Sequence, residues 1–282
     1  MNDFEKIFTI EFENLRVEIE CNDDEALQLA EMLFDDVSTV AADGSPKPTK
    51  QYNLSFTSPA ASMSLKEGST QLYSGSSRYD LAYSLVNDVL FHCISGNMHQ
   101  HAFHAGAVYR GNCGIILPGS SGSGKSTLTA WLIKNGFGYL TDELIFLAED
   151  GKMTPFTRPI NLKTREPIIT PEFHYKHADQ LLLSESGESM IPHRLLNTTF
   201  TVTEPYVTHF IFPTYRAGVS TELKSISSAQ CCFKLIESHV NARNLPAHGI
   251  ASLSNIARNC KAYTLLYSQF DGLVDIILSE LD

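Results

Sequence analysis

A glycine- and serine-rich segment of the chain ends in a Lys-Ser pair. Residues 119–126 read GSSGSGKS, which fits the phosphate-loop pattern GxxxxGK[ST]. Glycines let backbone N–H groups turn toward phosphate oxygens, and the helix that follows such a loop points its positive end at them. In this pattern Lys125 reaches the β- and γ-phosphates, while the Ser126 hydroxyl is a ligand for Mg²⁺. We therefore predict a site for ATP and Mg²⁺, with Lys125 stabilising the transferred phosphoryl group. The residues predicted to bind the nucleotide are Gly119, Ser120, Ser121, Gly122, Ser123, Gly124, Lys125, Ser126 and Thr127.

Two acidic residues, Asp142 and Glu143, follow 17 and 18 positions after Lys125. A helix over residues 126–135 would run about 15 Å away from the loop, and a strand over 137–141 would run about 16 Å back. The acidic pair is therefore expected beside the loop, where a carboxylate can bind Mg²⁺ or accept a proton from a hydroxyl. With Ser126, Asp142 and Glu143 are the predicted metal ligands. The alternative is a strand end with two solvated acids.

Three histidines, His99, His101 and His104, precede the first strand of this region. On a strand, His99 and His101 would share a face that His104 would not, and no cysteine or acid completes a set, which disfavours a zinc site. The six cysteines contain no CxxC pair and are expected to be reduced core residues.

The elements that must position these residues follow from local patterns. Short apolar strands are predicted at 107–109 and 113–117, a helix at 126–135 before Gly136, and strands at 139–140 and 144–147. Residues 183–205 are polar and irregular, which is typical of a surface excursion or a mobile loop. Further along, we expect a strand at 209–212 and helices at about 229–240 and 273–281.

The first part of the chain has a different pattern. Residues 8–21 alternate between apolar and polar side chains like a half-buried hairpin, and capping residues at 22–24 precede an amphipathic helix. A loop is expected at 41–50, then alternating strands and a second amphipathic helix before Gly96. We predict two domains: an α+β module at 1–96 and an α/β phosphate-loop domain at 97–282.

Composition excludes several classes of protein. The 282 residues include 21 basic and 32 acidic side chains, a formal charge of −11. A basic face for a nucleic-acid duplex is not expected, nor is a membrane partner, because no apolar run reaches about 18 residues. The first residues lack the regions of a signal peptide, so a cytoplasmic location is expected.

Three segments of the chain together resemble the HPr kinase/phosphorylase superfamily, and more closely its HPr-kinase-related branch. They are HAGAV at 104–108, LPGSSGSGKSTL at 117–128 and YLTDE at 139–143. The resemblance implies an α/β kinase core shared with ATP-dependent phosphoenolpyruvate carboxykinases. It also implies that His104 is an active-site histidine and that Asp142 is the general base.

The chain departs from the family's usual pattern at two points. Glu143 replaces the second aspartate, and the segment Glu-x-Arg-Gly-x-Gly is absent. The related branch includes kinases associated with lasso-peptide maturation and with exopolysaccharide systems, so the resemblance implies an acceptor other than HPr.

The expected activity is that of an ATP-dependent phosphotransferase acting on a hydroxyl of a peptide, a protein or a small molecule, most simply a serine. Arg158 and Arg216 are candidates for clamping a phosphate or the acceptor. One alternative is a nucleotide-binding partner or regulatory protein with little turnover, and another is a carboxykinase-like lyase. The sequence is compatible with a homo-oligomer and does not define the oligomeric state.

Overall fold

The computed structural model describes residues 6–13, 15–39, 47–57, 62–163, 167–201 and 203–281. The chain forms two compact units, residues 1–96 with 161–192 and residues 97–160 with 193–282. The sequence placed residues 161–192 in the second domain, whereas here they belong to the first unit. One reason is that β12 (Leu182–Leu183) packs on α2 (Arg78–Gly96), and the Tyr79 hydroxyl of α2 donates a hydrogen bond of 3.0 Å to Asn161 Oδ1.

The first unit is built on a five-stranded sheet in the order β1-β2-β3-β4-β5. Only β2 and β3 are parallel neighbours, and α1 forms the crossover between them. The elements are β1 (Lys6–Phe12), β2 (Leu15–Cys21), α1 (Asp24–Phe34), β3 (Lys50–Thr57), β4 (Ser62–Glu67), β5 (Thr70–Gly75) and α2 (Arg78–Gly96). The inserted segment adds β11 (Ile160–Leu162), α4 (Pro171–His177), β12 (Leu182–Leu183) and β13 (Ser189–Ile191).

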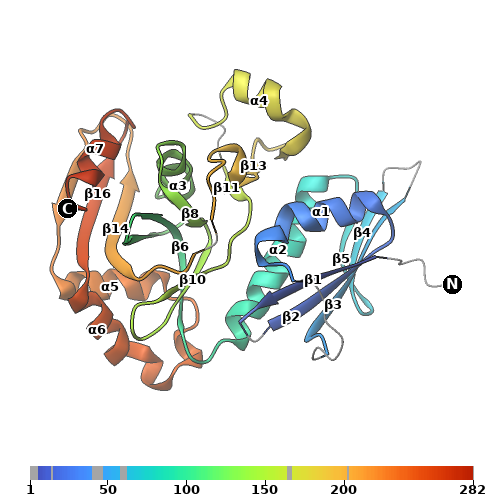
Figure 1. Ribbon diagram of the computed structural model, residues 1–282, viewed down its shortest axis with the longest axis horizontal. Coiled ribbons are helices and arrows are strands. Elements are labelled where there is room, and N and C mark those ends of the chain that lie inside the picture. The colour runs from blue at the N-terminus through green and yellow to red at the C-terminus, as the bar shows by residue number, and fades with distance from the viewer. Residues whose placement is uncertain are drawn as a thin grey trace. The chain divides into compact units, whose positions relative to one another are not determined.

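Local chemistry explains the predicted elements of this unit. The alternating residues of β1 and β2 pair as an antiparallel hairpin, which confirms the prediction for residues 8–21. Asp23 caps α1 by accepting a hydrogen bond of 2.8 Å from the backbone N–H of Ala26. Figure 1 shows α1 and α2 against the sheet of this unit. Of the loop predicted at 41–50, residues 41–46 lie outside the described residues, and Lys50 already begins β3.

The second unit contains a mixed eight-stranded sheet, in which seven strands follow the order β10-β9-β6-β7-β14-β16-β15 and β8 pairs with β6. Its strands are β6 (His101–Arg110), β7 (Cys113–Pro118), β8 (Gly138–Thr141), β9 (Leu144–Leu147), β10 (Met153–Pro155), β14 (Val207–Tyr215), β15 (Glu222–Ser225) and β16 (Lys261–Tyr267). Its helices are α3 (Lys125–Lys134), α5 (Ser228–Ser238), α6 (Ile250–Asn259) and α7 (Leu273–Leu278). In the first unit, short 3₁₀ turns lie at Asp35–Val37 and Ala178–Gln180, and in the second unit they lie at His193–Leu195, Ala242–Asn244 and Pro246–Gly249.

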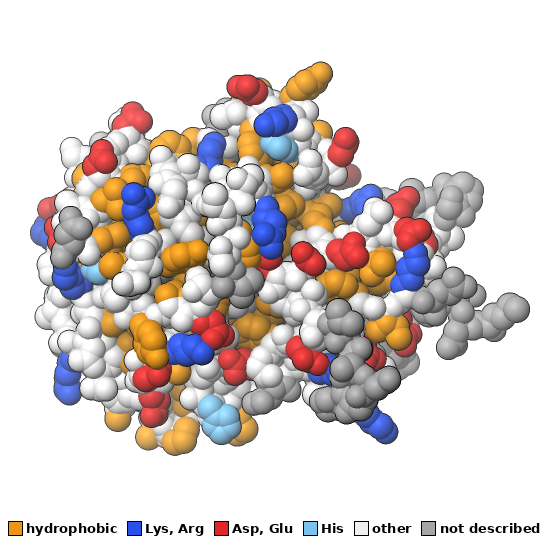
Figure 2. All heavy atoms as spheres, viewed as in Figure 1, with side chains coloured by type: hydrophobic (Ala, Val, Ile, Leu, Met, Phe, Trp, Pro, Cys, Tyr) orange, Lys and Arg blue, Asp and Glu red, His pale blue; other side chains and the backbone are white. Residues whose placement is uncertain are grey.

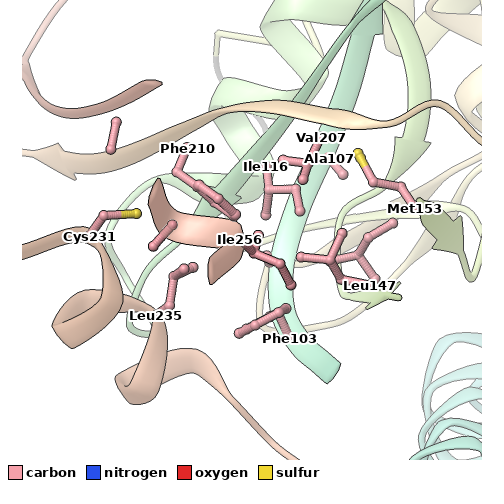
Figure 3. Close-up of a cluster of buried hydrophobic side chains, with 14 of the residues drawn as sticks. Phe103, Ala107, Ile116, Leu147, Met153, Val207, Phe210, Cys231, Leu235 and Ile256 are labelled. Atoms are coloured by element: carbon pink, nitrogen blue, oxygen red, sulfur yellow. The ribbon is translucent and has the colours of Figure 1, made fainter. Parts of the chain in front are cut away.

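Helices cover both faces of this sheet. Alternate residues of β6 point to opposite faces. Phe103, Ala105 and Ala107 join a core cluster with Leu235 of α5 and Ile256 of α6, and Figure 3 shows several of these side chains converging. On the other face, a Cβ atom built on Gly106 would lie 2.3 Å from Thr129 Oγ1 of α3. The sheet therefore lies between α3 on one side and α5 with α6 on the other.

The directions of the strands bring the phosphate loop and the acidic pair to the same end of the sheet. β7 and β8 each run antiparallel to β6, so they are parallel to each other with β6 between them. β14 lies on the other side of β7 and runs parallel to it. The loop after β7, the residues after β8 and the end of β14 thus share one end of the sheet.

Two expectations from the sequence need correction. Residues 183–205 are not irregular throughout, because β13 pairs with β12 and a 3₁₀ turn follows. The last third also holds β16 and α6, which were not predicted, and the final helix ends at Leu278. The sequence pattern does not indicate β16. Its neighbours bury most of its side chains, so it lacks the alternation of apolar and polar residues that is typical of a half-exposed strand.

The surface of the protein agrees with its acidic composition. On the face shown in Figure 2, Lys and Arg side chains are scattered singly among acidic ones. Within the residues that the structure describes, none of the helices combines the length and the apolar character needed to span a bilayer.

Candidate functional site

The predicted phosphate loop connects the end of β7 to the start of α3. Gly122 and Gly124 have φ angles of +84° and +92°, in the left-handed region that favours glycine. Gly119 and Gly124 leave no room for a side chain. A Cβ on Gly119 would lie 2.7 Å from Ser123 Oγ, and one on Gly124 would lie 2.3 Å from the Tyr267 hydroxyl. The glycines are therefore required by this backbone path, which leads directly into the N-terminus of a ten-residue helix.

Lys125 folds back over the loop that precedes it. Its Nζ donates hydrogen bonds to the carbonyl oxygens of Gly119, at 2.6 Å, and Ser120, at 3.0 Å. Ser123 Oγ is buried and has no hydrogen-bond partner among the residues that the structure describes. A buried ammonium group and an unpaired buried hydroxyl are both groups that a phosphate would satisfy. Ser126 and Thr127 lie in the first turn of α3 and are partly exposed.

One residue of β6 connects the loop to the acidic pair. Ala105 pairs with Pro118, the last residue of β7, on one side. On its other side, the Ala105 N–H donates a hydrogen bond of 3.1 Å to the Glu143 carbonyl oxygen. Because neighbouring strands lie about 4.8 Å apart, the backbones at Pro118 and Glu143 are separated by about 10 Å. The structure thus brings Asp142 and Glu143 to the end of the sheet where the loop begins.

The acidic pair belongs to a network with Arg158 and His104. Arg158 Nη2 lies 3.2 Å from Asp142 Oδ1 and 2.9 Å from Glu143 Oε2. His104 Nε2 lies 3.1 Å from Glu143 Oε1. The Tyr139 hydroxyl donates to the Arg158 carbonyl oxygen at 2.8 Å and lies 3.4 Å from Asp142 Oδ1. Three of the residues singled out by the sequence, His104, Asp142 and Glu143, therefore meet, together with the proposed clamp Arg158.

The two carboxylates differ in their access to solvent. The Asp142 side chain is fully buried and that of Arg158 is 4% exposed. By contrast, the side chains of Glu143 and His104 are 34% and 40% exposed. An incoming molecule can therefore reach Glu143 and His104 directly, whereas Asp142 is closed to it in this conformation.

The charge of Arg158 is fixed by its partners. Burial acts to lower the pKa of Arg158, but the carboxylates of Asp142 and Glu143 outweigh it, and the net shift of the pKa is upward. The arginine is therefore a permanent cation in the interior, and it compensates a carboxylate that has no contact with water. Each partner of such a pair depends on the other, because an isolated buried charge is costly.

Replacing Arg158 by methionine is expected to destabilise the protein by about 3–5 kcal/mol, because the buried Asp142 carboxylate would lose its counter-charge. Urea unfolding followed by circular dichroism measures this change. In the double variant Arg158→Met, Asp142→Asn the loss should be smaller than in Arg158→Met alone, since the orphaned charge is removed as well. Wild-type stability in Arg158→Met would show that the pair contributes nothing to the fold.

The remaining predicted residues are dispersed. His101 and His104 lie on opposite faces of β6, and His99 precedes the strand. Among the described residues, the three histidines do not form a group that could hold a metal ion. Arg216 follows β14 and is exposed; its backbone N–H donates a hydrogen bond of 2.9 Å to the Tyr267 carbonyl oxygen.

A pair formed by the buried His101 and the half-buried His239 lies apart from this network. His101 Nδ1 is 3.3 Å from His239 Nε2, and His101 Nε2 is 2.9 Å from Ser252 Oγ. Burial, and then the neighbouring His101, lower the pKa of His239 to about 4. Burial also lowers the pKa of His101. Sequence patterns give no signal for a pair separated by 138 positions.

This pair predicts how stability depends on pH. A histidine whose pKa is about 4 when folded and about 6.5 when unfolded binds fewer protons in the folded state between these values. The contribution of His239 to the free energy of unfolding should therefore be complete above pH 6.5. The free energy of unfolding should fall by on the order of 2 kcal/mol as the pH drops to 4. Urea unfolding at several pH values should give a shallower slope for His239→Gln than for the wild type. An identical slope in the two proteins would exclude His239 as the source.

A second cluster that the sequence did not reveal lies in the first unit. Glu67 of β4 and Asp88 and His92 of α2 form the one group, among the described residues, whose ligand atoms could meet at a metal ion. Both carboxylates already have protein partners. Lys50 pairs with Glu67, and the Tyr52 hydroxyl donates to Asp88 Oδ2 at 2.5 Å. The cluster is thus explained as a set of ion pairs and hydrogen bonds between the sheet and α2.

The chain has no match among protein families or curated sequences, and its likeness to a solved structure is distant. No protein-family model matches the chain, and no curated protein matches its sequence. Among solved structures, the chain is similar to the HPr(Ser) kinase/phosphatase from Coxiella burnetii, with a TM-score of 0.31 and 13% sequence identity. The similarity covers 63% of this chain and 91% of that chain. It is a distant likeness.

Proposed function

We propose that this protein is an ATP- and Mg²⁺-dependent kinase that transfers the γ-phosphoryl group of ATP to a hydroxyl, most simply that of a serine in a peptide or protein. In this proposal, residues 97–160 and 193–282 contain the catalytic core, of the HPr kinase and phosphoenolpyruvate carboxykinase type. The residues assigned to the reaction are Lys125, Asp142 and His104, with the loop at 119–127 binding the nucleotide.

The main support for the proposal is the position of Ala105, which lies between the phosphate loop and the acidic pair. This residue lies between Pro118, where the loop begins, and Glu143, to whose carbonyl oxygen it donates. Phosphoryl transfer needs cationic and N–H groups around the phosphates and a carboxylate near the attacking hydroxyl. The loop and the acidic pair thus lie on either side of β6 with their backbones about 10 Å apart, a distance that a phosphate and an acceptor group bound over this strand would bridge. The sequence segments that resemble HPr-kinase-related proteins, at 104–108, 117–128 and 139–143, supply these same groups.

The oxygen ligands at this end of the sheet suit Mg²⁺. Ser126, Asp142 and Glu143 would supply one hydroxyl and two carboxylates, the hard oxygen ligands that Mg²⁺ prefers. When bound, Mg²⁺ would neutralise negative charge on the phosphates. Buried Asp142 would become available as Arg158 moves from the carboxylates toward phosphate oxygens, which a guanidinium binds equally well.

The protein's own groups divide the remaining work. Loop N–H groups and Lys125 hold the phosphates and stabilise the charge on the transferred group. Asp142 accepts the proton of the acceptor hydroxyl as that oxygen bonds to the γ-phosphorus and the bond from the γ-phosphorus to the bridging oxygen of ADP breaks. His104 positions the acidic pair through its contact with Glu143.

A second function is favoured by one observation. The Asp142 carboxylate is fully buried and paired with Arg158, so in this conformation it is not available to an acceptor. A protein that kept this arrangement after binding ATP would act as a nucleotide-binding partner with little turnover. The two functions differ in whether ATP is consumed.

A screen of acceptors tests the proposal. The protein is incubated with Mg²⁺, ATP and serine-containing peptides, and in parallel with small alcohols, and intact masses are recorded. A gain of one phosphoryl group on a peptide supports a peptide kinase, whereas a gain on a small alcohol supports a metabolite kinase. Consumption of ATP no faster than in the absence of protein, despite tight binding, would favour the nucleotide-binding partner.

A further inference from the structure

An exposed tyrosine stands beside the phosphate loop. Tyr215 is the last residue of β14, and its side chain is 48% exposed. Its backbone N–H donates a hydrogen bond of 3.0 Å to the Ser123 carbonyl oxygen. A Cβ built on Gly124 would lie 3.2 Å from Tyr215 Cβ. The ring therefore emerges directly next to the loop, at the end of the strand beside β7.

The Tyr215 ring is held by other aromatic rings. It meets the buried Tyr267 edge to face, with ring centroids 5.6 Å apart and planes at 72°. The Tyr267 hydroxyl donates a hydrogen bond of 3.1 Å to the Gly124 carbonyl oxygen. Phe270 packs against Tyr267 at 5.5 Å and against Trp131 of α3 at 4.8 Å. Tyr215 is thus the exposed end of a ring cluster anchored to the loop and to α3.

The direction of a bound nucleotide follows from the order of strands. The acidic pair lies on the β6 side of β7, and Tyr215 lies on the β14 side. In the proposed function the terminal phosphate must face the acidic pair. The α-phosphate, the sugar and the base must then extend away from it, toward β14 and β16. Tyr215 is an exposed aromatic ring at that end of the sheet, and aromatic rings are groups on which bases stack.

We propose that Tyr215 is the platform on which the nucleobase stacks, with Tyr267 holding its ring in place. This inference rests on the proposed function, because it takes the loop to bind the phosphates of a nucleotide. Aromatic stacking contributes to affinity through the face of the base and leaves phosphate binding to the loop. The two contributions can therefore be separated with a ligand that has phosphates and no base.

Calorimetric titration of the full chain with Mg·ATP and with Mg·tripolyphosphate tests the platform. Tyr215→Ala should weaken ATP binding by about 5- to 100-fold, the range expected for the loss of one stacked base. The same variant should bind tripolyphosphate within about twofold of the wild type. Tyr215→Phe keeps the ring and should bind both ligands as the wild type does, and Tyr215→Leu, which keeps apolar bulk against Tyr267, should lose ATP affinity as the alanine variant does.

Tyr206→Ala is the matched control, since Tyr206 is 54% exposed and lies just before the opposite end of β14. It should change neither affinity. Unchanged ATP affinity in Tyr215→Ala would overturn the platform while leaving the phosphate loop intact. Equal losses for ATP and tripolyphosphate would also overturn it, because Tyr215 would then act by supporting the loop. A wild type that binds neither ligand would overturn the proposed function itself, and the platform with it.

Discussion

Lys125→Ala should lower the affinity for Mg·ATP by about 100-fold or more and abolish measurable turnover. The ammonium group reaches back over the loop, where it donates hydrogen bonds to the carbonyl oxygens of Gly119 and Ser120. Hydrogen bonds to charged groups contribute about 1.5–3 kcal/mol each, and a phosphate bound there would receive at least one. Titration calorimetry measures the affinity, and thermal unfolding checks that the variant is folded.

Lys134→Ala removes the same charge from the other end of the same helix, where the side chain is exposed, and should bind ATP as the wild type does. Comparable affinities for wild type and Lys125→Ala would mean that the loop does not bind phosphates.

Asp142→Asn should keep nucleotide binding and lose phosphoryl transfer by about 10²- to 10⁴-fold, the usual cost of removing a general base. The amide cannot take up the proton of the hydroxyl, and it is a weaker ligand for Mg²⁺ than a carboxylate. The variant is expected to fold, because Glu143 still pairs with Arg158 at 2.9 Å. Single-turnover transfer to an identified acceptor is the measurement.

Two further variants sharpen this test. Glu143→Gln should bind ATP and lose less activity than Asp142→Asn if Asp142 is the base. Asp179→Asn changes an exposed carboxylate in the first unit and should have no effect. Transfer that is intact in Asp142→Asn and lost in Glu143→Gln would move the base to Glu143, the more accessible carboxylate of the pair.

Elements governed by neighbouring residues could be predicted from the sequence. The hairpin at 8–21, the cap at Asp23 and the strand, loop and helix around Gly119 each depend on short patterns, and the structure has them. The return of Asp142 to the loop end also follows from counting residues along one helix and one strand. The catalytic and ligand roles given to these residues stay predictions.

Contacts between distant segments could not be predicted. The sequence indicates Arg158 only as a candidate clamp for a phosphate or the acceptor, because no local pattern shows that it lies between two carboxylates. Tyr215 and Tyr267 meet because β14 and β16 are parallel neighbours, and β16 itself gave no clear alternation. The grouping of residues 161–192 with the first unit likewise depends on packing across the chain.

Cleavage of ATP tests the central claim most directly. The wild type, Asp142→Asn and Lys125→Ala are incubated with Mg·ATP, with water as the stand-in for the hydroxyl acceptor, and the phosphates are followed by phosphorus NMR. We expect slow formation of ADP and inorganic phosphate by the wild type, about 100-fold less by Asp142→Asn, and none above background by Lys125→Ala. A wild type that binds ATP yet forms ADP no faster than Asp142→Asn would contradict this claim.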